Sequence, residues 1–130
     1  MMQNTPYSSL PVYQKSLALR DLGNAIATYF SKDNNLFNLQ RTASLREHIA
    51  SALFTDSSLI SKQIEEAETS NSYETRVKSA SFINVMTRNI LSYCNGLEHD
   101  GVEEKEYVNL LRKELKSFHL SFKQWRKSFN

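Results

Sequence analysis

The residues with the clearest capacity for chemistry are basic side chains near the end of the chain. Residues 111–130 hold six Lys or Arg and only one acidic residue. On a helical wheel these cations fall in one sector, between roughly 100° and 240° from Tyr107, and no nearby acid falls inside it. Segregated cations of this kind are typical of phosphate-binding surfaces. We therefore predict contacts with RNA or DNA from Arg112, Lys113, Lys116, Lys123, Arg126 and Lys127.

Four of these cations lie on one stripe with spacings of four, seven and four residues: Arg112, Lys116, Lys123 and Lys127. They could follow a nucleic-acid backbone over roughly two dozen ångströms of helix. Only Gln124 lies among them with an amide side chain for base edges, and we expect little sequence specificity. A row of Lys and Arg on a helix is also commonly just its solvated face. Both interpretations stay open at this point.

Residue patterns for catalysis or metal binding are missing from the sequence. None of His48, His99 and His119 follows a Glu by three positions, which is the pairing that di-iron helical bundles need. There is no His-Glu-x-x-His motif, no pair of cysteines and no glycine-rich phosphate loop. We expect no catalytic residue, no metal and no cofactor, and therefore a protein that is not an enzyme.

Cysteine usage and hydropathy suggest where the protein acts. The only cysteine, Cys94, cannot form an intramolecular disulfide, so a reducing cytoplasm is the expected compartment, with Cys94 as a small buried apolar residue. No apolar run approaches membrane-spanning length, and the start MMQNTPYSS lacks the features of a secretory signal. The net charge of +2 is too mild to indicate nucleic acid by itself.

The stretch that carries the cations also carries a strong apolar stripe. Seven residues fall within an arc of about 80° on the same wheel. Their spacings alternate between three and four, which predicts an amphipathic helix with an aromatic core face. We expect Trp125 to be largely buried there, beside the other members of the stripe: Tyr107, Leu111, Leu115, Phe118, Phe122 and Phe129.

The first helix is predicted to follow a flexible arm of residues 1–8, with Ser9 as its cap and Pro11 in its first turn. A second, smaller apolar strip lies almost opposite its main face, so the helix is either deep in a bundle or in contact with another subunit. We favour the subunit contact, formed by Leu10, Tyr13 and Leu17. The main face that we expect to be buried is Ala18, Leu19, Leu22, Ala25, Ile26, Tyr29 and Phe30.

The second helix is predicted from about residue 37 to residue 67. Thr55-Asp56-Ser57-Ser58 interrupts it with short polar side chains, so the helix either continues with these residues in solvent or is kinked and capped again at Asp56. The acids at its end, Glu65, Glu66 and Glu68, are interpreted as solvated. Its expected stripe is Leu45, Ile49, Ala50, Leu53, Ile60, Ile64 and Ala67.

A third helix follows the polar connector at residues 69–72 and is expected to end between Gly96 and Gly101. Its expected apolar side is Tyr73, Val77, Ala80, Phe82, Ile83, Met86, Ile90, Tyr93, Cys94 and Leu97. Three glycines and two prolines leave few tight turns, which argues against many short strands. The predicted fold is therefore all-α, with residues 9–130 forming a single up-down-up-down antiparallel four-helix bundle.

Three segments resemble a family of bacterial four-helix bundles. They are the opening Leu10-Pro11-Val12-Tyr13-Gln14-Lys15-Ser16-Leu17, the end of the second helix at residues 58–67, and the close Trp125-Arg126-Lys127-Ser128-Phe129. The family comprises proteins related to ribosomal RNA intervening-sequence proteins and the accessory variability-determinant proteins of diversity-generating retroelements. Ile64 and Glu66 match its signature, and Ala67 takes the place of its terminal small residue but replaces the usual glycine. Gln63 and Glu65 also depart from it.

The resemblance implies a non-enzymatic accessory protein that forms a symmetric homo-oligomer, with pentamers known, and binds nucleic acid through basic surfaces. It agrees with the first of two functional hypotheses, a nucleic-acid-binding bundle that uses the cations of the last helix. The second hypothesis is a protein-interaction or scaffolding bundle without a nucleic-acid role. Salt separates them, because phosphate binding weakens steeply as salt rises and an apolar interface does not.

Overall fold

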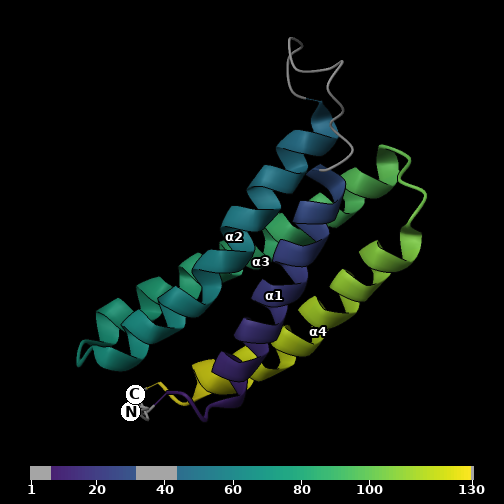
Figure 1. Cartoon of the computed structure of the whole chain (residues 1–130). Coiled ribbons are helices and arrows are strands. Elements are labelled where there is room, and N and C mark those ends of the chain that lie inside the picture. The colour runs from purple at the N-terminus through teal and green to yellow at the C-terminus, as the bar shows by residue number, and fades with distance from the viewer. Residues whose placement is uncertain (1–6, 32–43, 130) are drawn as a thin grey trace, which may run out of the picture.

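The computed structural model describes residues 7–31 and 44–129, and these fold into four helices (Figure 1). They are α1 (Pro11–Ser31), α2 (Leu45–Thr69), α3 (Tyr73–His99) and α4 (Lys105–Lys127). Successive helices run in opposite directions, and the described residues contain no strand. The prediction of an all-α, up-down-up-down bundle is confirmed. No described helix is long and apolar enough to cross a membrane.

Local capping explains where several helices begin and end. The Ser44 hydroxyl accepts from the Glu47 N–H while the Glu47 carboxylate accepts from the Ser44 N–H, so α2 starts with a capping box. Ser72 caps α3 through the Thr75 N–H. Gly101 follows α3 with a φ of 83°, a left-handed conformation that glycine adopts without strain. The parts of the predicted arm and second helix at residues 1–6 and 37–43 lie outside the described residues.

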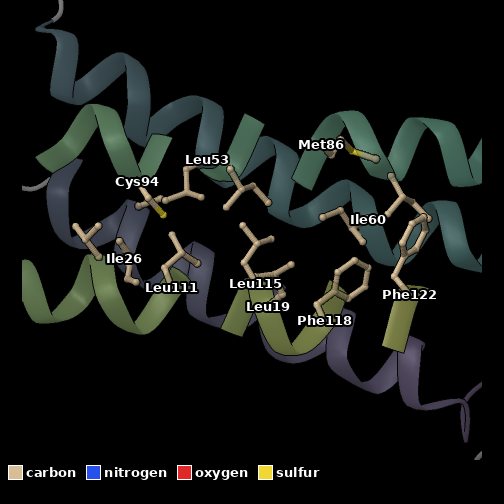
Figure 2. Close-up of a cluster of buried hydrophobic side chains, with 14 of the residues drawn as sticks. Leu19, Ile26, Leu53, Ile60, Met86, Cys94, Leu111, Leu115, Phe118 and Phe122 are labelled. Atoms are coloured by element: carbon tan, nitrogen blue, oxygen red, sulfur yellow. The ribbon is translucent and has the colours of Figure 1, made fainter. Parts of the chain in front are cut away.

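The core is one continuous column of apolar side chains between the four helices (Figure 2). α4 contributes Leu111, Phe118 and Phe122, and Trp125 is only 6% exposed, as predicted. Cys94 on α3 is also buried. At the start of α4 the prediction is shifted by one residue, because Val108 is fully buried whereas Tyr107 is 36% exposed.

The buried face of α1 differs from the predicted one. Ala18 and Ala25 are exposed, and Tyr29 is 38% exposed. At 100° per residue, the centre of the buried face of α1 lies between the two apolar strips that the sequence shows. These strips therefore flank a single buried surface on its two sides. Apolar periodicity missed this face because two of its central residues, Ser16 and Gly23, are small. The buried set is Val12, Ser16, Leu19, Gly23, Ile26, Ala27 and Phe30.

Three other aromatic or aliphatic residues that were expected in the core are largely exposed. Leu45 on α2 and Tyr73 and Phe82 on α3 have exposed fractions of 55%, 56% and 54%. Leu45 and Tyr73 are the first residues of their helices, where fewer neighbours are available to cover them. Phe82 lies at the edge of the apolar side of α3.

The polar set at residues 55–58 does not break α2, and it is not solvated as a whole. Ser57 is fully buried, and its hydroxyl donates to the Leu53 carbonyl at 2.6 Å. The Asp56 carboxylate accepts from the Tyr93 hydroxyl at 2.6 Å. Burial first, and this hydrogen bond second, raise the pKa of Tyr93 to about 12. These polar residues therefore join α2 to its neighbours.

Two acids near the end of α2 were expected to be solvated but accept hydrogen bonds from other helices. The Tyr13 hydroxyl donates to Glu65 at 2.7 Å, and the Trp125 Nε1–H donates to Glu68 at 2.7 Å. The hydrogen bond to Glu65 is the main reason that the pKa of Tyr13 rises to about 12. Only Glu66 of the three is exposed, as the sequence suggested.

We predict that Gly23→Ala destabilises the bundle although alanine is the better helix former. A Cβ at position 23 would lie 2.6 Å from Ser57 Oγ and 2.7 Å from Ser57 Cβ, so α1 and α2 must move apart. Overpacking costs about 1–3 kcal/mol and the gain in helix propensity is about 1 kcal/mol, so the free energy of unfolding should fall by up to about 2 kcal/mol. Chemical denaturation followed by circular dichroism measures this difference in the free energy of unfolding between the variant and the wild type.

Gly96→Ala is the matched control, because Gly96 is also a helical glycine. Its added Cβ would meet only the flexible end of Ile49, with Cδ1 at 2.8 Å. That methyl group can rotate away, so stability should change little or rise by up to about 1 kcal/mol. Equal losses in both variants would contradict the proposed role of the Gly23–Ser57 contact.

Candidate functional site

The predicted phosphate-binding cations lie together on the outer side of α4. Lys113, Lys116, Lys123, Arg126 and Lys127 are exposed. Within the described part of the chain, none of the five has a carboxylate partner. The dipole of α4 favours this arrangement, because Arg126 and Lys127 lie in the last turn of the helix, where the dipole stabilises positive charge.

A groove between α3 and α4 lies along the same side of the bundle. It consists of two hollows of about 620 Å³ and 460 Å³, and both are lined by Asn84 and His119. We call this continuous feature the α3/α4 groove. Seven of its described lining residues are Lys or Arg, and none is Asp or Glu. The seven are Arg88, Arg112, Lys113, Lys116, Lys123, Arg126 and Lys127.

The floor of the α3/α4 groove is apolar. Leu91 is 45% exposed there, whereas Leu115 and Phe122, which also line the groove, are buried, with exposed fractions of 7% and 2%. The ring of His119 stacks on Phe122 with 6.3 Å between centroids, so an exposed imidazole covers part of the floor. The groove thus combines cationic edges with a floor of aliphatic and aromatic groups.

Arg112 differs from the other cations because it is bound within the chain. Its guanidinium donates to the Glu98 carboxylate at 3.0 and 3.2 Å and to Asn95 Oδ1 at 2.8 Å. This interaction lowers the pKa of Glu98 below its ordinary value and raises that of Arg112. Arg112 therefore joins α3 to α4 beside the groove, and a phosphate would have to compete with Glu98 for it.

Four groove residues were missed at the sequence level because they come from α3: Asn84, Thr87, Arg88 and Leu91. Arg88 adds a cation on the edge opposite α4, and Asn84 adds an amide that lines both hollows. They are four residues apart, so they lie on one face of α3. That spacing was the available signal, but it becomes informative only when α3 and α4 are known to be neighbours.

A separate hollow of about 290 Å³ lies between the start of α1 and the second half of α4. We call it the α1/α4 hollow, and Leu10, Leu120 and Trp125 are among its lining residues. Leu120 is the most exposed large apolar residue of the described chain, at 63%. Of the predicted subunit contacts only Leu10 lines this hollow; Tyr13 and Leu17 are half-buried elsewhere on α1.

The remaining candidate groups for chemistry lie apart from the groove. Burial raises the pKa of the Cys94 thiol to about 11. His48 and His99 are exposed. In residues 7–31 and 44–129 no three His, Cys, Asp or Glu side chains lie close enough together to hold a metal ion.

In residues 7–31 and 44–129 the protein is a small all-α bundle with a cationic groove between α3 and α4. Comparison with protein families, curated proteins and solved structures finds no match for the chain. The groove itself is therefore the starting point for assigning a function.

The Glu98–Arg112 ion pair yields a pH prediction. Because the folded pKa of Glu98 is lowered, the stabilisation is present above the ordinary carboxyl pKa of 4.5 and is lost as the pH falls through the folded value. Arg112→Gln should raise the pKa of Glu98 back toward 4.5. A carbon-13 NMR titration of side-chain carboxyl groups measures this change.

Proposed function

We propose that this protein is a non-enzymatic accessory protein that binds RNA or DNA through the phosphates, along the α3/α4 groove. The observation that carries the proposal is the composition of that groove, in which seven Lys or Arg side chains from two helices line one channel without an acid among its described lining residues. A merely solvated helix face does not require a contribution from a second helix or a channel between the two.

The free cations are suited to phosphate binding. Each phosphate that they neutralise releases condensed counterions, so affinity falls steeply with salt concentration. Arg88 and Arg126 can each donate two hydrogen bonds to one phosphate. Arg112 contributes less, because its guanidinium is already bound to Glu98. Phosphate contacts fix position without reading sequence, so sequence preference should be slight.

The likeness to bacterial four-helix-bundle accessory proteins supports the same proposal and adds a symmetric homo-oligomer, with a pentamer as one form. A ring would bring several α3/α4 grooves to one rim, and linked sites gain affinity through their high effective concentration. We place this activity in the cytoplasm, where a single unpaired cysteine is most common.

Charge reversal at two groove lysines tests the proposal. Lys116→Glu/Lys123→Glu should abolish binding to mixed-sequence RNA and DNA while leaving helicity and melting temperature nearly unchanged, because both side chains are exposed. Fluorescence anisotropy at several salt concentrations gives the affinity and its salt slope. The matched control is Lys15→Glu/Lys62→Glu, which makes the same change in net charge at exposed sites on α1 and α2.

Equal losses in the two double variants would mean that net charge alone controls binding and would contradict a localised site. Absence of wild-type binding even at low salt would mean that the cations are only solvated.

The second candidate function is protein–protein interaction or scaffolding, and the α1/α4 hollow favours it. Leu120 at 63% exposure beside the partly buried Leu10 provides an apolar surface that a second subunit could cover. The half-buried positions of Tyr13 and Leu17 leave less apolar area on α1 than the sequence suggested. We therefore place the centre of the proposed subunit contact nearer to Leu10 and Leu120.

We predict that sedimentation equilibrium at micromolar concentration gives a mass above the 15.0 kDa of one chain. Leu120→Asp should reduce that mass, because it places a charge in the contact. Leu110→Asp is the control, since Leu110 is 51% exposed on α4 but does not line the hollow. A wild-type monomer would rule out the homo-oligomer.

A further inference from the structure

We propose that the occupant of the α3/α4 groove is a single strand of nucleic acid, with bases against the apolar floor and phosphates along the cationic edges. This inference rests on the proposed function and adds the form of nucleic acid to it. It starts from the observation that cations and apolar groups lie in the same channel, an arrangement that plain phosphate binding does not need.

The floor of the groove offers what unstacked bases require. Leu91 is 45% exposed, and the exposed imidazole of His119 lies over Phe122. The exposed ring of His119 can stack on the face of a base, and Leu91 offers an apolar contact beside it. Such contacts have little sequence preference because every base has a π face. A groove that served only phosphates would gain nothing from half-exposed leucine.

The edges of the groove match the backbone of such a strand. Arg88 lies on the α3 edge, opposite Lys113 and Lys116 on the α4 edge. The second hollow continues the row with Lys123 and Lys127. A strand along the two hollows would therefore meet cations over its whole course, while its bases point between the helices.

Polar groups inside the channel can bind base edges. The Asn84 amide lines both hollows and can donate and accept hydrogen bonds. The His119 imidazole lines both hollows as well. The Thr87 hydroxyl lines the first hollow but already donates to the Asn84 carbonyl at 2.9 Å, so it can offer only an acceptor. These groups are too few to read a sequence, in agreement with low specificity.

A duplex fits this groove less well than a single strand does. Its bases are paired and stacked inside the helix, where the floor between α3 and α4 cannot reach them. Proteins that read a duplex insert a protruding helix or ribbon into the major groove, whereas this site is a concave channel between two helices. Duplex binding would use the cations alone and leave Leu91 in contact with water.

The decisive experiment uses probes of equal length; the single strands and the abasic oligomer carry equal charge, and the duplex carries twice as much. The wild-type protein is titrated with oligo(dT), oligo(U), a dT·dA duplex and an abasic deoxyribose-phosphate oligomer, all at one salt concentration. We expect both single strands to bind at least about tenfold more tightly than the abasic oligomer, because stacking of one base on a side chain is worth roughly that factor or more. They should also bind more tightly than the duplex per phosphate.

Two leucine variants place the effect in the groove. Leu91→Asn removes the apolar floor without changing charge and should weaken binding of oligo(dT) and oligo(U) several-fold, with no change for the abasic oligomer. Leu110→Asn is matched in type and exposure, 51% against 45%, but lies outside both hollows and should change neither. Circular dichroism confirms that both variants keep the helical fold.

The outcomes separate this inference from the proposed function. Equal affinity for single strands, abasic oligomer and duplex would overturn the inference and leave phosphate binding intact. Absence of binding to every probe at low salt would overturn both. Tight binding of an acidic amphipathic helical peptide, with no binding of oligonucleotides, would mean that the groove receives a protein helix and would also overturn both.

Discussion

The close contact of α1 and α2 at Gly23 and Ser57 is the constraint on which the arrangement of this bundle depends. Helices approach closely only where small residues face each other, and here the hypothetical Cβ of residue 23 has no space beside the serine. Among the four pairs of neighbouring helices, α1 and α2 are accordingly the most extensively packed, and α3 and α4 the least. Because Phe118, Phe122 and Trp125 fill the core side of α4, their volume holds that helix away from its neighbours.

The α3/α4 groove follows from this unequal packing. α3 and α4 pack less closely than α1 and α2, and the core residue Phe122 lines the channel between them. The Arg112–Glu98 interaction joins the two helices near the loop between them. Apart from Arg112, the cations of both helices can then face the same channel without a paired acid. If α3 and α4 were packed closely together, these like charges would repel one another more strongly.

The fold could be predicted from the sequence because each helix carries an apolar stripe long enough to identify by its spacing. The stripe of α4 was placed almost correctly, since its large aromatic residues dominate the pattern. The face of α1 was misplaced because Ser16 and Gly23 are central to the contact and have no apolar signal. The cations of α4 were identified from one helix alone. Asn84 and Arg88 were missed, because their role depends on which helix lies beside α3.

The burial of Cys94 has a consequence for how motions of this bundle can be observed. Its thiol lies within the buried apolar core (Figure 2), and its pKa is raised to about 11, so almost no thiolate exists near neutral pH. The thiolate is the form that reacts with alkylating reagents. Modification therefore requires the helices to separate first. As the only cysteine of the chain, it reports the frequency of that opening at a single known position without an introduced label.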